Sequence, residues 1–206
     1  KELNQDDIDI LEYEDIYAAL MKIEDNQIIL VDPGNTNHRL FGSINKKCTI
    51  VERPNPAIAL KAIKNDIEIA HLRQTLIKDG EAVVNFLFWL EHQPDNAQIT
   101  ELTVADTLYG FRKKQELFVD NSFDPIMAYR DHSAMCHYSA TMQTNIPIAD
   151  KGMFLTDSGG NYLSGTTDIT RTIFKGNPSK QEITDYTLVL KGHISVATIL
   201  FPKGTR

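Results

Sequence analysis

Two aspartates that lie eleven positions apart, Asp157 and Asp168, are the residues of this chain with the clearest chemical potential. Asp157 is followed by Ser-Gly-Gly, a turn-forming run, and Asp168 lies in a segment rich in β-branched residues. We therefore expect a tight β-hairpin that turns both carboxylates toward one pocket. Two close carboxylates repel each other unless a divalent cation between them supplies compensating charge. The pair predicts a metal site, although either aspartate alone would more often serve a turn.

His137 lies twenty positions before Asp157, in a run that we expect to form a strand over residues 134–139. A lone histidine on an apolar strand is more often part of the core than catalytic. Neighbouring residues of a strand point to opposite faces, so Cys136 is not expected to pair with His137 as a nucleophile. We expect Cys136 to be buried and structural. His132 is expected to be an exposed loop histidine, although it could line the same pocket as His137.

Several other side chains have two possible roles. Arg171 could pair with a carboxylate beside the site or form an ordinary surface salt bridge, and Tyr162 and Thr167 could bond to the site or pack in the sheet. The aromatic cluster at residues 86–89 is more typical of a core than of a ligand site. The remaining histidines are expected to be structural or solvated: His38, His71, His92 and His193.

The hydrophobic periodicity and the capping residues predict the elements that hold these side chains. Expected helices cover residues 6–23, 35–44, 65–92, 100–115 and 179–201, and expected strands cover residues 27–31, 48–51, 123–129 and 134–139. Ser179 and Glu182 form a capping-box pattern at the start of the last helix. Two prolines in residues 53–56 indicate a linker, so we expect one domain in residues 1–56 and a second in residues 57–206.

Composition limits the function classes. The chain has 206 residues, 42% hydrophobic content and a formal net charge of −7, which is typical of a soluble globular protein with room for a sizeable core. The acidic balance argues against nucleic acid as a partner. No apolar run reaches the roughly 20 residues of a membrane span. Two cysteines are too few for a disulfide framework, so we expect a reducing, cytoplasmic location.

The motifs together resemble the Xaa-Pro aminopeptidases of the pita-bread metallopeptidase family. The resemblance is carried by the segments 59–65, 137–141, 157–168 and 188–205, and nearly all of the chain after Ile58 fits it. It implies an α/β fold in which the end of a creatinase-like domain precedes the first half of a pita-bread domain with a curved, mainly antiparallel sheet. One departure is His132-Ser133, where many members carry a small turn pair such as Asn-Gly.

The resemblance also implies an activity and a ligand set. Members use two divalent metals, usually manganese, to release the N-terminal residue of peptides that have proline in second position. Asp157 matches a terminal metal ligand, Asp168 matches the ligand that bridges both metals, and His137 matches a histidine that binds substrate. The other three ligands of the family lie beyond Arg206 in its members, and the chain opens without Met. We therefore expect this piece alone to be catalytically silent.

Two other functions remain open at this stage. One is a pita-bread domain kept as a peptide- or protein-binding module without hydrolysis, and the other is a prolidase that acts on Xaa-Pro dipeptides. The residues around Asp157 and Asp168 resemble the aminopeptidase branch more closely. Half of a sheet would expose an edge strand and an apolar face, so we also expect a homo-oligomer.

Overall fold

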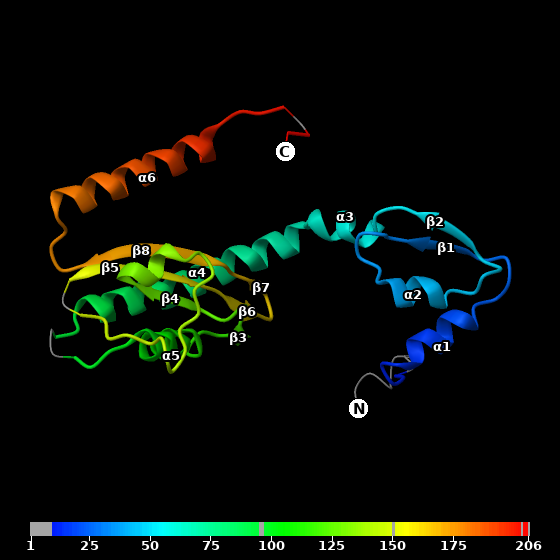
Figure 1. Cartoon of the computed structure of the whole chain (residues 1–206), viewed down its shortest axis with the longest axis horizontal. Helices are drawn as coiled ribbons and strands as arrows, with labels where there is room; N and C mark the ends of the chain where they lie inside the picture. Colours follow the sequence, from blue (N-terminus) through cyan, green and yellow to red (C-terminus); the bar gives the residue numbers. More distant parts are fainter. Residues whose placement is uncertain (1–9, 95–96, 150, 203, 206) are drawn as a thin grey trace. The chain divides into compact units, whose positions relative to one another are not determined.

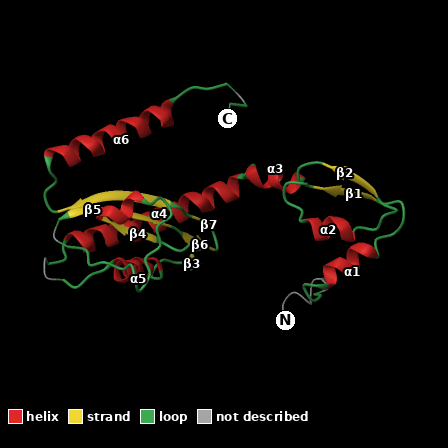
Figure 2. Ribbon diagram, viewed as in Figure 1, coloured by secondary structure: helices red, strands yellow, loops and turns green. Residues whose placement is uncertain are grey.

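The chain forms two compact units, Lys1–Asn65 and Asp66–Arg206, in a computed structural model that describes residues 10–94, 97–149, 151–202 and 204–205 (Figure 1). Each unit combines helices and strands, which confirms the predicted α/β class (Figure 2). Across these described residues, no helix combines the length and the apolar character needed to cross a membrane. The predicted division of the chain at residue 56 stays a prediction.

The first unit contains the predicted strand, helix and strand. Strands β1 (Ile28–Val31) and β2 (Thr49–Glu52) pair in parallel, and α2 (His38–Ser43) connects them. Helix α1 (Asp15–Met21) is shorter than predicted. Residues 6–9 of that prediction lie outside the described part of the chain, and residues 10–14 are not helical.

Short polar caps fix the other helix starts of this unit. The Asn37 side chain accepts a hydrogen bond from the Leu40 amide at 2.9 Å at the start of α2. A further helix, α3 (Pro56–Ala62), was not predicted; it begins with Asn55 as its cap and proline at its first position. Proline is favoured there because its fixed φ suits a helix and its missing N–H has no partner in the first turn.

The second unit holds all the candidate site residues. Its helices are α4 (Asp66–Glu91), α5 (Glu101–Arg112) and α6 (Lys180–Thr198), and a 3₁₀ helix, η2, covers Arg130–Ala134. Its strands are β3 (Phe118–Asn121), β4 (Ile126–Tyr129), β5 (Gly152–Ser158), β6 (Gly160–Tyr162), β7 (Gly165–Thr166) and β8 (Ile169–Lys175). They pair antiparallel in two sheets with the orders β3-β6-β7 and β4-β5-β8. The predicted helices at 65–92, 100–115 and 179–201 are confirmed, with capping boxes at Thr100 and Ser179.

The predicted strand over residues 134–139 is wrong. Arg130 has a φ of 51°, a left-handed conformation that ends β4 and begins η2. Beyond η2 the backbone turns twice, because the amide of Met135 donates to the carbonyl of His132 and the amide of Tyr138 donates to the carbonyl of Met135. The strand predicted at 123–129 is confirmed only for β4.

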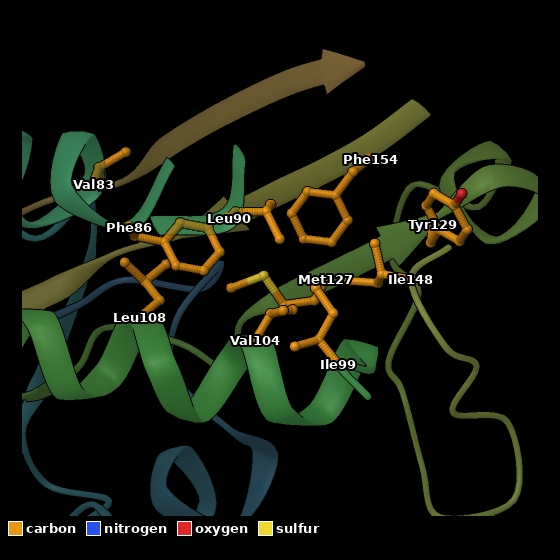
Figure 3. Close-up of a cluster of buried hydrophobic side chains, with 10 residues drawn as sticks. All are labelled: Val83, Phe86, Leu90, Ile99, Val104, Leu108, Met127, Tyr129, Ile148 and Phe154. Carbon is orange, nitrogen blue, oxygen red and sulfur yellow. The ribbon is translucent and has the colours of Figure 1, made fainter. Parts of the chain in front are cut away.

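The core lies between α4, α5 and one face of the β4-β5-β8 sheet (Figure 3). Its ten buried hydrophobic residues are Val83, Phe86, Leu90, Ile99, Val104, Leu108, Met127, Tyr129, Ile148 and Phe154. Each fully buried side chain of this size contributes about 1.5–3 kcal/mol to stability. Phe86 and the partly buried Trp89 stack in this core, whereas Phe88 is 63% exposed.

Helix α6 lies over the opposite face of the β4-β5-β8 sheet. A hollow of about 460 Å³ between α6 and the sheet is lined by Met153 and Thr172 from the strands and by Tyr186, Leu190 and His193 from the helix. None of the residues of α6 is buried. The two faces of the sheet therefore differ, because one is closely packed and the other is open.

A buried ion pair joins α4 to α5, and a hydrogen bond from β6 to the same carboxylate adds the third element. Arg112 donates to Asp79 through Nε at 2.7 Å and through Nη2 at 3.2 Å, and both side chains are almost fully buried. The Tyr162 hydroxyl donates to the same carboxylate at 2.9 Å. Helical periodicity along α4 would place Leu76 in the core, but the structure buries Thr75 and Asp79 instead and leaves Leu76 46% exposed.

Replacing Asp79 with Asn should lower the free energy of unfolding by about 3 kcal/mol, because the Arg112 guanidinium stays buried without an anionic partner. Urea unfolding monitored by circular dichroism measures this loss. Lys78→Met is the matched control, because Lys78 pairs with Glu116, whose side chain is 85% exposed. Such a pair is worth at most about 1 kcal/mol. Equal losses in the two variants would contradict a special role for the buried pair.

Stability should also fall as the pH rises above about 10. Burial, followed by the hydrogen bond and charge of Asp79, raises the pKa of Tyr162 above its ordinary value of 10.0, and burial raises the pKa of Tyr138. The unfolded state then loses these protons at lower pH than the folded state, so stability is fully present below pH 10 and is lost at higher pH. Urea unfolding at several pH values should give a shallower alkaline loss for Tyr162→Phe than for the unaltered chain. An unchanged slope would contradict the assignment.

Candidate metal centre

The strand register assigns the two aspartates to the same side of the β4-β5-β8 sheet. Phe154 points into the core, and Asp157, three residues along β5, belongs to the opposite face. Asp157 pairs directly with Thr170 of β8. Asp168 directly precedes β8, two residues before Thr170, and extending the alternation of β8 by one residue assigns Asp168 to the face of Asp157. The predicted placement of both carboxylates toward one side follows from this register.

The chemistry of the pair fits a divalent cation. Oδ1 of Asp157 is buried and has no hydrogen-bond partner in the described part of the chain, while the Asp168 residue is exposed. A buried carboxylate oxygen without a partner is costly, and a cation with a preference for oxygen ligands would satisfy it. No group of three or more His, Cys, Asp or Glu residues that could hold a metal occurs among the described residues. The predicted centre thus has two candidate ligands among the described residues, Asp157 and Asp168.

The chain reverses between the aspartates, as predicted, but not in one tight hairpin. Gly159 separates β5 from β6, which pairs with β3 in the other sheet. The turn lies at Leu163 and Ser164, between β6 and β7, and not at Gly159 and Gly160 as predicted. The ten residues between Asp157 and Asp168 thus contain a small hairpin of their own. The base of this hairpin, where Gly160 faces Thr167, sets the spacing of the two carboxylates, and the turn does not.

Hydrogen bonds fix the base of this small hairpin. The Gly160 amide donates to Oγ1 of Thr167 at 2.9 Å, and the Thr167 amide donates to the carbonyl of Gly160 at 2.9 Å. Ser122, directly after β3, donates through its amide to the carbonyl of Gly159 and through its hydroxyl to the carbonyl of Thr167, both at 3.0 Å. The residues immediately after Asp157 and immediately before Asp168 are therefore held together.

Gly159 leaves no room for a side chain. A Cβ at this position would lie 1.9 Å from the carbonyl oxygen of Thr167 and 2.3 Å from Oγ of Ser122. Both atoms belong to the hydrogen bonds that hold the hairpin base, so neither can move away without breaking a contact. The glycine in the Asp-Ser-Gly-Gly run is thus required by close packing, not by a turn.

His137 lies in the loop after η2 and is exposed. It has no hydrogen bond to any other described residue, so its imidazole is available to a ligand. The structure corrects the environment predicted for two neighbours. Cys136 is exposed and not buried. His132 is not a solvated loop residue, because its side chain is only 22% exposed and Nδ1 lies 2.8 Å from Oε1 of Glu101.

Glu101 is a buried acceptor that the sequence analysis did not single out. Its carboxylate is fully buried and receives the Tyr138 hydroxyl at 2.8 Å and the Tyr129 amide at 2.9 Å, besides the contact with His132. The available signal was weak. Glu101 follows the Thr100 cap in the first turn of α5, where an acid complements the helix dipole and would ordinarily be exposed.

The remaining candidates have structural partners. Tyr162 bonds to Asp79 and Thr167 bonds to Gly160, so each takes the packing role of its two predicted roles. Arg171 is exposed and donates to the carbonyl of Thr170. Within the described residues it forms neither of the ion pairs that were considered.

Comparisons with known proteins agree with this fold. Residues 70–206 match metallopeptidase family M24, and residues 1–68 match the creatinase/prolidase N-terminal domain. A probable Xaa-Pro aminopeptidase P of Trichophyton verrucosum is 45% identical over 158 residues, which cover 76% of this chain and 23% of the relative. The Xaa-Pro aminopeptidase ApepP of Drosophila melanogaster is 35% identical over 200 residues, which cover 97% of this chain and 33% of the relative.

A solved structure is similar over almost the whole chain. The X-prolyl aminopeptidase of Caenorhabditis elegans, described as a cytosolic enzyme with a di-nuclear active site, matches with a TM-score of 0.85 at 33% identity. The match covers 98% of this chain and 34% of that protein. The predicted creatinase-like and pita-bread folds are thereby confirmed. The chain spans a quarter to a third of the length of these relatives, between 23% and 34%.

Gly159→Ala should lower both the stability of the second unit and its affinity for Mn²⁺, because the hairpin base must open to admit the methyl group. We expect a loss of about 3 kcal/mol or more in unfolding free energy, in the range of overpacked and strained sites. Gly110→Ala is the control, since nothing lies within 4 Å of a Cβ there and alanine is favoured in a helix by up to about 1 kcal/mol. Urea unfolding and calorimetric titration with Mn²⁺ measure both effects. An unchanged affinity in a folded Gly159→Ala chain would refute the link between the base and the aspartates.

Proposed function

The chain belongs to metallopeptidase family M24, and on this premise we propose that the protein releases the N-terminal residue from peptides that have proline in second position. The observation that carries the proposal is the pair Asp157 and Asp168 on one sheet face, with a buried oxygen of Asp157 that has no partner. Relatives named as Xaa-Pro aminopeptidases support the substrate class.

Asp157 and Asp168 would hold two divalent metal ions, with Asp157 as a terminal ligand and Asp168 shared between the metals. Manganese is our proposal for their identity, because carboxylate oxygens suit hard divalent cations. When bound, such metals lower the pKa of a water molecule toward neutrality and polarise the scissile carbonyl. The pairing of β5 with β8 would hold the two aspartates on one side of the sheet, which would then be the side that substrate enters.

His137 would bind the substrate. Its exposed imidazole can donate a hydrogen bond to the carbonyl oxygen of the scissile bond and stabilise the charge that develops on it during attack. It is not proposed as a metal ligand. Cys136 has no role in this mechanism, although it is exposed beside His137.

Two carboxylates are too few for tight binding of a cation that prefers about six ligands. We therefore propose that this chain alone binds Mn²⁺ weakly and does not cleave peptides, and that activity needs ligands from outside it. We also propose a cytoplasmic location, as described for the Caenorhabditis elegans relative, and association into homo-oligomers through exposed strand edges.

Two alternative functions stay distinguishable by experiment. A prolidase would prefer Xaa-Pro dipeptides to longer peptides, and a binding module would hold peptides without hydrolysis. The presence of both aspartates argues against the binding module, because a protein that no longer hydrolyses has no need of a buried, unpartnered carboxylate oxygen.

The full-length protein loaded with Mn²⁺ should cleave a tripeptide with proline second, and Asp168→Asn should reduce kcat by about 100-fold or more, in line with the loss of a metal ligand or its partner. Asp124→Asn, a change at an exposed loop carboxylate, should leave the rate unchanged. Release of the first residue is followed by chromatography. The same assay on residues 1–206 alone should show no turnover.

Three outcomes would count against the proposal. Faster cleavage of Xaa-Pro dipeptides than of tripeptides would indicate a prolidase. Tight peptide binding without cleavage would indicate a binding module. Activity of residues 1–206 that disappears in Asp168→Asn would show that this chain needs no further ligands.

A further inference from the structure

We propose that Glu101, Tyr138 and His132 form a positioning cluster that fixes the loop carrying His137. This inference rests on the proposed function, because it assigns a purpose to the loop through the substrate-binding role of His137. The three residues do not touch the reacting atoms. They act through the placement of His137, and so they are positioning residues.

The centre of the cluster is the Glu101 carboxylate at the first turn of α5. It is fully buried and accepts from the Tyr138 hydroxyl at 2.8 Å, from the Tyr129 amide at 2.9 Å and from the Ile146 amide at 3.4 Å. A carboxylate has only acceptor sites, so each of these groups must donate. A fourth contact comes from His132. The four donors lie at residues 129, 132, 138 and 146, which are the two ends and the middle of one loop.

His132 supplies the fourth donor. Its Nδ1 lies 2.8 Å from Oε1 and 3.1 Å from Oε2 of Glu101, so Nδ1 carries the proton. Its ring also packs on the ring of Tyr138, with centroids 4.4 Å apart. His132 and Tyr138 thus reach one carboxylate from either side of His137 in sequence, and the backbone between them has little freedom.

The second half of the loop is tied to the same helix turn. The Leu102 amide donates to Oδ1 of Asn145 at 3.1 Å. The Thr141 amide donates to Oγ1 of Thr144 at 2.9 Å, which closes a tight turn. Cys136 and His137 are exposed and lie between His132 and Tyr138, both of which contact Glu101 of α5.

This arrangement explains why so much buried polar structure surrounds an exposed histidine. A histidine on a free loop would lose orientational freedom each time substrate binds, whereas a preset one does not. Glu101 supplies the fixed point because its charge makes the hydrogen bonds strong and its burial shields them from water. At position 132, where the chain departs from the small turn pair of many family members, His132 combines a donor to Glu101 with a ring that packs on Tyr138. A pair such as Asn-Gly has no ring to do this.

The test is a double-mutant cycle in the full-length Mn²⁺-loaded protein. Tyr138→Phe and Glu101→Gln should each lower kcat/KM for a tripeptide with proline second by about 10-fold or more, the scale expected of a misplaced catalytic group. In a His137→Ala background the same changes should cost less than about 2-fold, because residues that act through one group are not additive. Equal losses in both backgrounds would overturn the proposal.

Asp106→Asn is the matched control, a carboxylate-to-amide change at an exposed position of α5. It should leave kcat/KM within about 2-fold of the unaltered enzyme in either background. Tyr138→Phe keeps the aromatic ring and removes only the hydroxyl, so it serves if Glu101→Gln does not fold. Mn²⁺ affinity should stay unchanged in Tyr138→Phe, and its loss would mean a general structural defect and contradict the proposal.

A second readout does not depend on activity. Cys48 and Cys136 are the two cysteines of residues 1–206, so Cys48→Ser leaves Cys136 as the single labelling site there. A nitroxide label on Cys136 then reports the motion of the loop beside His137 by electron paramagnetic resonance. Glu101→Gln and Tyr138→Phe should sharpen its lines, and Asp106→Asn should not. Unchanged line shapes would overturn the positioning role. If the full-length protein cleaves no Xaa-Pro peptide while the lines respond as expected, the proposed function fails and the anchoring of the loop stands.

Discussion

The buried pair of Asp79 and Arg112 is the constraint on which the second unit depends. Two charges removed from water are tolerated only with close geometry and further hydrogen bonds, and here Tyr162 adds one from β6. Asp79 lies 33 residues from Arg112 and 83 from Tyr162 in sequence. Any slip of α4 against α5, or of either against β6, would leave a buried charge unpaired. The pair therefore selects one arrangement of these three elements.

Helix α5 carries this constraint to both parts of the candidate site. Its last residue, Arg112, fixes Asp79 and through it β6, the strand that follows Asp157 and Gly159. Its first residue, Glu101, anchors the loop of His137. The helix spans about 18 Å at the usual rise per residue. One rigid element thus positions both β6, next to the predicted metal ligands, and the loop of His137, which are far apart in sequence.

The sequence predicted what local rules decide and missed what distant partners decide. Helix starts at Thr100 and Ser179 follow from residues three positions apart, and the alternation that places Asp157 follows from strand geometry. The path of residues 134–139 does not, because it is set by Glu101, more than 30 residues away. The same limit applies to α4, where periodicity favours Leu76 as a core residue but the remote Arg112 requires Asp79 to be buried.

The two faces of the β4-β5-β8 sheet express opposite physical demands. Stability demands the dense packing of Phe154 and Met127 against α4 and α5. A metal centre demands the reverse, namely carboxylates that lack protein partners and can be reached by ligand. Strand alternation separates these demands by a single residue, so that β5 can pack tightly through Phe154 and still present Asp157 on the open face. The dense packing around Phe154 helps to offset the cost of the unpartnered Oδ1 of Asp157 on the other face of the same strand.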